Sequence, residues 1–310
     1  MEKSTEISSK FWSLPQKPKE ETDREKLFID DIISKNHIEK ELLKIPKNIK
    51  TVFDGGAGCG RFSILLAGLG LKVTHFDISQ PMIEKAKEIA GQKGVSGNMT
   101  FIRGELENLD MFRDREFDLV ISFDSPISYA YPKQCETIKN LIRICSKKLI
   151  IGVYSRLAWT YHFDPAQKFK YIIDRNSGNP LVRWQIDNGL KMRRDYKPDM
   201  AAVKNFYSTG LMEKYEETIK KAENGTPWPV SYAFMPDELK AILQDNGLKN
   251  IKLAGPGALS RSIPGEVLAN IFKDEKLKKE FLEFCYEYDS HEHVSGMGKD
   301  NILASADMPD

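Results

Sequence analysis

The sequence predicts an α/β fold, in which a doubly wound, mostly parallel, seven-stranded sheet carries helices on both faces. Two observations predict it: short apolar segments alternate with helical patterns from Thr51 onward, and a glycine-rich turn joins the first strand to a helix. A third observation divides the chain, because this alternation stops over residues 156–229, which are rich in aromatic side chains, and then resumes. We therefore expect an N-terminal helical cap segment (1–47), a sheet domain (48–155 and 230–306) and an inserted lid (156–229).

The N-terminal segment is predicted to form one or two amphipathic helices. Thr22 and Glu25 have the spacing of a capping box, which satisfies free backbone N–H groups at the start of a helix. Apolar residues then recur at helical spacing from Phe28 to about Lys44, and Pro46 ends the helix.

The sheet domain is predicted from strands and helices in strict alternation. Ser79 is a candidate N-cap and Gly70 a candidate helix end. The predicted strands are 51–53, 71–76, 99–102, 117–122, 148–154, 248–253 and 301–306. The predicted helices are 61–69, 80–91, 135–145, 236–246 and 265–288.

Composition excludes several classes of protein. The 46 Lys and Arg residues balance 45 Asp and Glu residues, so a nucleic-acid-binding protein with a broad basic surface is not expected. Four cysteines form no C-x-x-C pair, which favours reduced thiols in a cytoplasmic protein. The chain begins without an apolar leader, and its apolar runs fall far short of the about 20 residues that span a membrane, so no membrane span and no membrane partner are expected, and only peripheral contact is left open.

The segment from Asp54 to Arg61 is the most informative motif for function, with the sequence Asp-Gly-Gly-Ala-Gly-Cys-Gly-Arg. Glycines let the backbone turn tightly and approach a ligand, and the following helix start offers free N–H groups. The dinucleotide fingerprint G-x-G-x-x-G would need glycine at Arg61. The spacing present instead is D-x-G-x-G-x-G, which resembles the glycine loop of the class I, Rossmann-like S-adenosylmethionine (SAM)-dependent methyltransferases.

Three further strand ends extend the resemblance, which covers roughly residues 48–155 and 230–306. A carboxylate such as Asp77, which closes the second strand, can accept both ribose hydroxyls of a nucleoside. The resemblance implies that SAM is the cofactor and S-adenosylhomocysteine (SAH) the product. It implies these cofactor-binding residues: Asp54, Gly55, Gly56, Gly58, Gly60, Arg61, Asp77, Ile78, Met82, Glu105, Leu106 and Phe123. Within this set Ile78 and Met82 pack on adenine, while Glu105 and the Leu106 backbone bond its edge.

The sequence predicts candidate catalytic residues but does not identify the molecule that accepts the methyl group. Family members that methylate amino groups of nucleobases often carry Asn/Asp-Pro-Pro-aromatic after the fourth strand, whereas this chain has Asp124-Ser125-Pro126-Ile127. Asp124, Tyr129 and His162 are the candidate catalytic residues, with His162 as a possible general base. The lid supplies candidate wall residues, which are Trp159, Tyr161, His162, Phe163 and Trp184.

We expect a SAM-dependent methyltransferase that acts on a small-molecule acceptor. An enzyme acting on RNA or protein, and a non-catalytic SAM-binding regulator, are the alternatives that the sequence leaves open. No metal is expected, since the His291-Glu292-His293 pair lacks a third ligand nearby. Oligomeric state and the methylated atom also stay open.

Overall fold

The computed structural model describes residues 4–159, 163, 167–194, 196–212, 229–299 and 301–309. Its N-terminal segment forms helices α1 (Ser4–Trp12), α2 (Lys17–Leu27) and α3 (Ile29–Leu43), so helical structure up to about Lys44 is confirmed. The predicted capping box is wrong. Thr22 lies inside α2, where its hydroxyl donates to the Pro18 carbonyl one turn earlier, at 3.1 Å. Pro18, which lies in the first turn, sets an earlier helix start.

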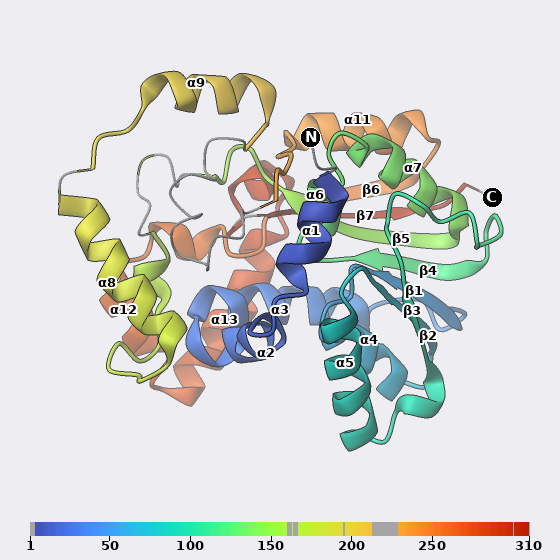
Figure 1. The fold of residues 1–310 in the computed structure, drawn as a ribbon, viewed down its shortest axis with the longest axis horizontal. Helices are drawn as coiled ribbons and strands as arrows, with labels where there is room; N and C mark the ends of the chain where they lie inside the picture. The colour runs from blue at the N-terminus through green and yellow to red at the C-terminus, as the bar shows by residue number, and fades with distance from the viewer. Residues whose placement is uncertain are drawn as a thin grey trace.

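Seven strands form one sheet in the order β3-β2-β1-β4-β5-β7-β6 (Figure 1). Strands β1 to β5 pair in parallel, and β7 runs antiparallel to β5 and β6. This confirms the predicted doubly wound, mostly parallel sheet. The strands are β1 (Thr51–Gly55), β2 (Lys72–Asp77), β3 (Met99–Arg103), β4 (Phe117–Ser122), β5 (Cys145–Tyr154), β6 (Lys249–Ala254) and β7 (Asn301–Asp307). The chain order reverses between β1 and β4, and ligands bind beyond the carboxyl ends of such strands.

Helices cover both faces of the sheet, as Figure 1 shows. Helices α4 (Arg61–Gly68) and α5 (Gln80–Gln92) lie on one face with α3, while α7 (Gln134–Ile144) and α11 (Pro236–Asp245) lie on the other. Successive side chains of β1 point to opposite faces of the sheet. Val52 packs with Phe62 of α4 on one face, and Phe53 belongs to the core around Leu141 of α7 on the other. A short helix, α6 (Pro126–Tyr129), follows β4 directly.

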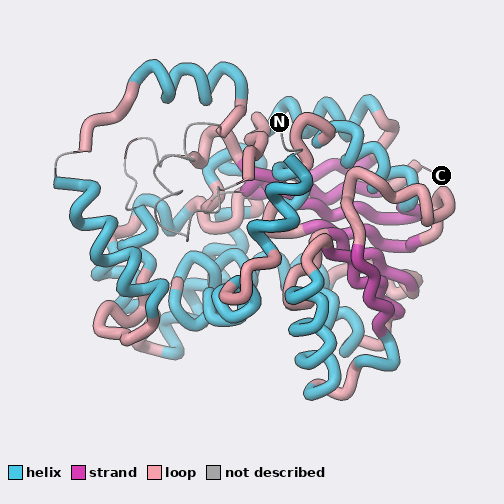
Figure 2. Tube along the Cα trace, in the orientation of Figure 1, coloured by secondary structure: helices cyan, strands magenta, loops and turns pink. Residues whose placement is uncertain are grey.

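The segment between β5 and α11 leaves and rejoins the sheet domain at one place. Bridges pair Ser155 with Phe234 and Leu211 with Tyr232. Between them lie a 3-10 turn η2 (Gln167–Tyr171), α8 (Pro180–Arg194) and α9 (Met200–Thr209), drawn among loops in Figure 2.

The predicted helix 265–288 is two helices, α12 (Gly265–Ile271) and α13 (Glu275–Asp289). The break follows from Asp274, whose carboxylate accepts from the N–H groups of Lys276 and Leu277 at 2.9 and 3.0 Å and so starts a new helix. Three further 3-10 turns are η1 (Ser96–Asn98), η3 (Leu259–Ser262) and η4 (Glu292–Met297). Within the described ranges, no helix is long and apolar enough to cross a bilayer.

Candidate active site

The glycine loop follows β1 and enters α4 at the point where the strand order reverses. Gly56 has φ 70°, and a Cβ there would lie 2.3 Å from the Pro126 side chain, so the loop packs closely on the start of α6. Gly58 has φ 55°, and a Cβ there would meet no atom within 4 Å. Gly56 is therefore needed for the close contact with Pro126. At Gly58 the absence of a side chain leaves the backbone accessible to a ligand.

Asp77 ties the glycine loop to the end of β2. Its two carboxylate oxygens accept from the backbone N–H groups of Gly58, at 2.7 Å, and Ser79, at 2.8 Å. Burial raises the pKa of this carboxyl to about 6, against those hydrogen bonds, which lower it. A carboxylate offers about four lone-pair sites, so about two stay available to a ligand after the two backbone bonds.

Asp54 turns into the protein, away from the carboxyl edge of the sheet. Its carboxylate accepts from the Ser63 hydroxyl at 2.6 Å, and that hydroxyl lies 3.1 Å from Nδ1 of His75. Burial raises the pKa of Asp54 to about 7 and lowers the pKa of His75 to about 4. The three side chains join β1, α4 and β2 directly beneath the glycine loop. Ser63 is not among the predicted site residues, because one serine in an apolar helix carries no signal of its own.

The predicted adenine-side residues lie past β2 and β3. Ile78 is half-buried, and Met82 is buried in α5 with its sulfur 3.4 Å from the Cys59 sulfur. Glu105 is exposed, whereas the Leu106 side chain belongs to the main core and reaches Gly55. These positions leave the Glu105 carboxylate and the Leu106 backbone as the groups that a ligand could meet.

The loop after β4 has an unusual backbone. Asp124 and Ser125 both adopt left-handed conformations, with φ 58° and 67°. Consecutive non-glycine residues there are uncommon and tend to mark functional sites. The preceding Phe123 is buried, with its ring centroid 4.9 Å from that of Phe62, so the strand end is anchored and Asp124 stays at the edge.

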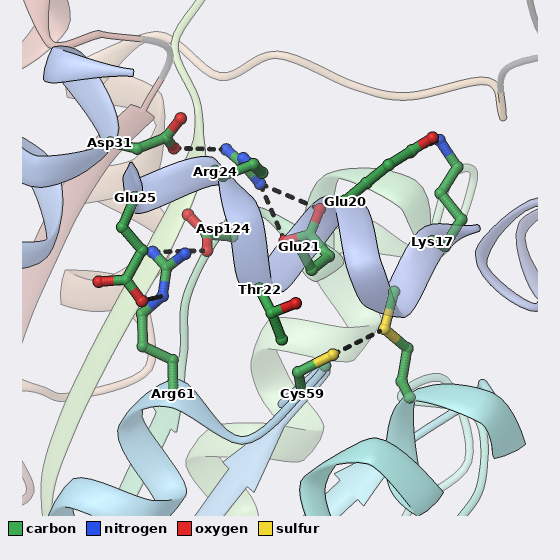
Figure 3. Close-up of polar contacts among 12 residues, drawn as sticks. Lys17, Glu20, Glu21, Thr22, Arg24, Glu25, Asp31, Cys59, Arg61 and Asp124 are labelled. Atoms are coloured by element: carbon green, nitrogen blue, oxygen red, sulfur yellow. Dashed lines mark hydrogen bonds and ion pairs between the residues drawn. The ribbon is translucent and has the colours of Figure 1, made fainter. Parts of the chain in front are cut away.

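The N-terminal helices cover this edge, which the sequence analysis anticipated only in outline. Figure 3 shows α2 crossing above the loop that carries Cys59 and Arg61. The Arg61 guanidinium lies 3.4 Å from Glu25 of α2 and 4.0 Å from Asp124. The Cys59 thiol donates to the Pro18 carbonyl at 3.5 Å. The glycine loop and α2 are therefore joined by ionic and hydrogen-bonded contacts.

The link from α1 to α2 makes two more contacts with the predicted site. The Ser79 hydroxyl donates to the Trp12 carbonyl at 2.9 Å, and the Trp12 ring packs edge-on against Tyr129 at 5.7 Å. Lys17 is buried, with its ammonium 4.1 Å from the Phe11 ring centroid. Trp12 thereby bridges the start of α5 and the end of α6.

The predicted lid residues divide into three groups. Trp159 is buried and packs against Tyr154, whose hydroxyl lies 2.5 Å from that of Tyr129. Phe163 is exposed, and Trp184 lies on α8, away from the glycine loop (Figure 1). Tyr161 and His162 lie outside the described residues, so the role of His162 stays a prediction. In the part of the chain that the structure describes, no three His, Cys, Asp or Glu side chains gather as a metal site would require.

Known proteins share this arrangement. A family model described as a methyltransferase domain matches residues 52–148. The tRNA 5-carboxymethoxyuridine methyltransferase of Escherichia coli K12 is 37% identical over 70 residues, which cover 23% of this chain and 27% of the relative. The magnesium-protoporphyrin O-methyltransferase of Synechocystis sp. is 32% identical over 102 residues, 33% of this chain and 43% of the relative. The chain thus spans less than half the length of either curated relative.

A solved structure extends the likeness to the whole fold. The magnesium protoporphyrin IX methyltransferase of Synechocystis PCC 6803 with bound SAH superposes with a TM-score of 0.53 at 14% identity, covering 99% of this chain and 100% of that one. At this identity the likeness concerns the fold. The likeness therefore shows a class I, Rossmann-like methyltransferase fold, and the region that contains the glycine loop matches a methyltransferase domain.

Proposed function

We propose that this chain transfers the methyl group of SAM to a small-molecule acceptor by in-line displacement. The observation that carries the proposal is the set of polar groups at one edge of the sheet: bare backbone at Gly58, a doubly anchored carboxylate at Asp77 and a second carboxylate at Asp124. SAM supplies an activated methyl on a sulfonium, so the protein has to bind, align and exclude water.

The donor groups present fit SAM. The two remaining lone-pair sites of Asp77 match the two ribose hydroxyls, and Gly58 leaves room for the methionine part. Ile78 and Met82 would pack on adenine, with Glu105 and the Leu106 backbone at its edge. Gly55, Gly56, Gly60, Arg61 and Phe123 complete the proposed cofactor site. We assign Asp54 an indirect part, because its bond to Ser63 holds the loop from below.

The residues proposed for catalysis lie after β4. Asp124 would face the acceptor, and Tyr129, whose hydroxyl meets that of Tyr154, would form a wall of the acceptor site. His162 keeps its proposed role as a general base. Methyl transfer needs a base only where the acceptor has to lose a proton before or during the attack.

The two segments outside the sheet domain would act as covers. Residues 4–27 contact the glycine loop, the start of α5 and the end of α6, which supports the proposed cap role of residues 1–47. In the inserted segment 156–229, Trp159 packs beside Tyr154, which supports a lid over the acceptor side. Closed covers exclude water from the transferring methyl.

Incubation with methyl-labelled SAM and a cell extract, followed by fractionation by mass, tests the proposal. Label in the small-molecule fraction is the expected result. Label in protein would contradict the acceptor class. SAH binding without any labelled product would instead identify a non-catalytic SAM-binding regulator.

RNA is the second candidate acceptor, because the Escherichia coli relative is a tRNA methyltransferase by name. That likeness covers only 23% of this chain, and the balanced charge weighs against it. Filter binding of bulk tRNA decides the matter, since phosphate contacts make affinity fall steeply with salt. Tight, salt-dependent binding together with label in tRNA would replace the small-molecule proposal.

A further inference from the structure

The Asp124 carboxylate is accessible to a ligand. Its side chain is 38% exposed, and its contact with a described residue is the ion pair to Arg61 at 4.0 Å, beyond hydrogen-bonding distance. Arg61 lies nearer to Glu25, at 3.4 Å. The left-handed backbone at Asp124 and Ser125 holds this carboxylate at the end of β4, where the methyl group would be presented under the proposed function.

A cavity of about 10 Å³, room for about one water molecule, lies beside Asp124, between α3 and the carboxyl ends of β4 and β5. Its polar lining includes Ser34, Lys299 and Asn301, and Gly152 of β5 contributes no side chain to fill it. Lys299 is the cation of this lining, and it is neutralised by Asp31 at 2.7 Å and Asp30 at 3.5 Å.

The atoms around the cavity favour a hydrogen-bond donor over an anion. The Asn301 carbonyl oxygen accepts from the Ser125 hydroxyl, and one buried carboxylate oxygen of Asp31, Oδ2, has no hydrogen bond to any described residue. Three cations near this site, Arg24, Arg61 and Lys299, already face carboxylates. An anionic acceptor would have to displace one of these ion pairs, whereas a donor meets acceptor atoms directly.

Four aromatic rings pack in series beyond the end of β4. Trp12 packs on Tyr129 at 5.7 Å, Tyr129 on Tyr154 at 5.6 Å, and Tyr154 on Trp159 at 5.2 Å between centroids. The series therefore runs from α1 through α6 and β5 into the inserted segment. Tyr129 and Trp159 are both buried, so these rings exclude water from this side of the site.

We propose that the acceptor is a small amine, methylated on nitrogen, whose N–H group donates to the Asp124 carboxylate. This inference rests on the proposed methyltransferase function and names its substrate class. The bond to Asp124 orients the nitrogen lone pair toward the methyl carbon. The neutral amine forms the new N–C bond while the C–S bond breaks and its electron pair stays on sulfur, giving SAH. The methylated ammonium then loses one proton to water.

The test uses SAM with a trideuterated methyl group, the purified full-length protein, and a protein-free extract of the source organism. A panel of arylalkylamines and carboxylic acids with matched carbon skeletons, such as phenethylamine and 3-phenylpropionic acid, runs in parallel. Tandem mass spectrometry locates the deuterated methyl group in each product. We expect it on nitrogen, and a methyl on oxygen, carbon or sulfur, or no small-molecule product, overturns the amine assignment.

Two substitutions separate Asp124 from the cofactor site. Asp124→Gly deletes the carboxylate and suits the left-handed backbone, while Asp124→Asn keeps one acceptor oxygen and tolerates that conformation. We expect kcat/KM for the amine to fall about 100-fold in the glycine variant and about 10-fold in the asparagine variant. SAH affinity should stay within about threefold of wild type in both. Asp245→Asn, at an exposed helix end, is the control.

The outcomes distinguish this inference from the proposed function. If wild-type protein fails to bind SAH, the proposed function fails first. If it binds SAH and methylates an amine equally well without the Asp124 carboxylate, the role of Asp124 is refuted.

Discussion

Asp77→Asn provides the most quantitative test of the proposed cofactor site. In the wild-type protein the two carboxylate oxygens accept from Gly58 and Ser79, at 2.7 and 2.8 Å, which leaves one further lone-pair direction on each oxygen for a ribose hydroxyl. An asparagine replaces one oxygen with an N–H₂ group, so one ribose bond is lost and the other no longer has a charged acceptor. Hydrogen bonds to charged groups contribute about 1.5–3 kcal/mol each.

The expected loss in binding free energy is therefore about 3 kcal/mol, or roughly 100-fold in the dissociation constant of SAH. Isothermal titration calorimetry of both proteins with SAH measures this ratio, with Asp245→Asn as the matched control. A thermal unfolding scan of the ligand-free variant checks that the glycine loop region still folds. An affinity within about threefold of wild type, in a folded variant, would refute the ribose assignment.

Four other predictions follow from the contacts around the site and the inserted segment. Burial raises the pKa of Asp77 to about 6 and that of Asp54 to about 7, above their value in the unfolded chain. The folded protein therefore holds these two protons more tightly than the unfolded chain does. Their contribution to the stability of the ligand-free fold is complete below about pH 4 and is lost as pH rises through about 6 to 7. Because the ribose hydroxyls need the ionised form of Asp77, SAH affinity should rise with pH up to about pH 7, and calorimetry across this range should show a flatter profile in Asp77→Asn. Trp12→Ala should weaken SAH binding about 10-fold, because it removes the ring that packs between Ser79 and Tyr129. The tryptophan fluorescence of the wild-type protein should also change more on SAH binding than that of Trp12→Phe. Arg156→Ala should lower the free energy of unfolding by about 2 kcal/mol in a denaturant titration, because this guanidinium bonds the Ala233 carbonyl where the inserted segment rejoins the sheet domain. A denaturant-measured stability of the ligand-free protein that does not fall between about pH 4 and 7, an SAH affinity independent of pH, an unchanged Trp12→Ala affinity, or an Arg156→Ala stability equal to wild type would contradict each in turn.

Much of the sheet domain was predictable, because its signals are local. The apolar strands, the glycine loop and Asp77 lie in short stretches whose spacing follows directly from strand and turn geometry. The N-cap at Ser79 is confirmed, since its hydroxyl accepts from the Met82 N–H at 3.4 Å. The late strand 301–306 is likewise confirmed, as β7.

What could not be predicted depends on contacts between distant segments. Nothing in the polar segment around Glu25 indicates that it meets Arg61, because that ion pair joins residues far apart in the chain. The break before α13 was missed because Phe272 and Phe281, which pack together across it, continue the apolar pattern while Asp274 starts a new helix. The buried chain from Asp54 through Ser63 to His75 spans three elements, so its members look unrelated in the sequence.

The central claim is that the carboxyl edge over the glycine loop binds the SAM cofactor. Calorimetric titration of the wild-type protein with SAH tests it most directly, because the product lacks the reactive methyl and needs no acceptor. We predict saturable binding at a single site with a dissociation constant in the micromolar range, or about −8 kcal/mol. No measurable binding at millimolar SAH would contradict the account.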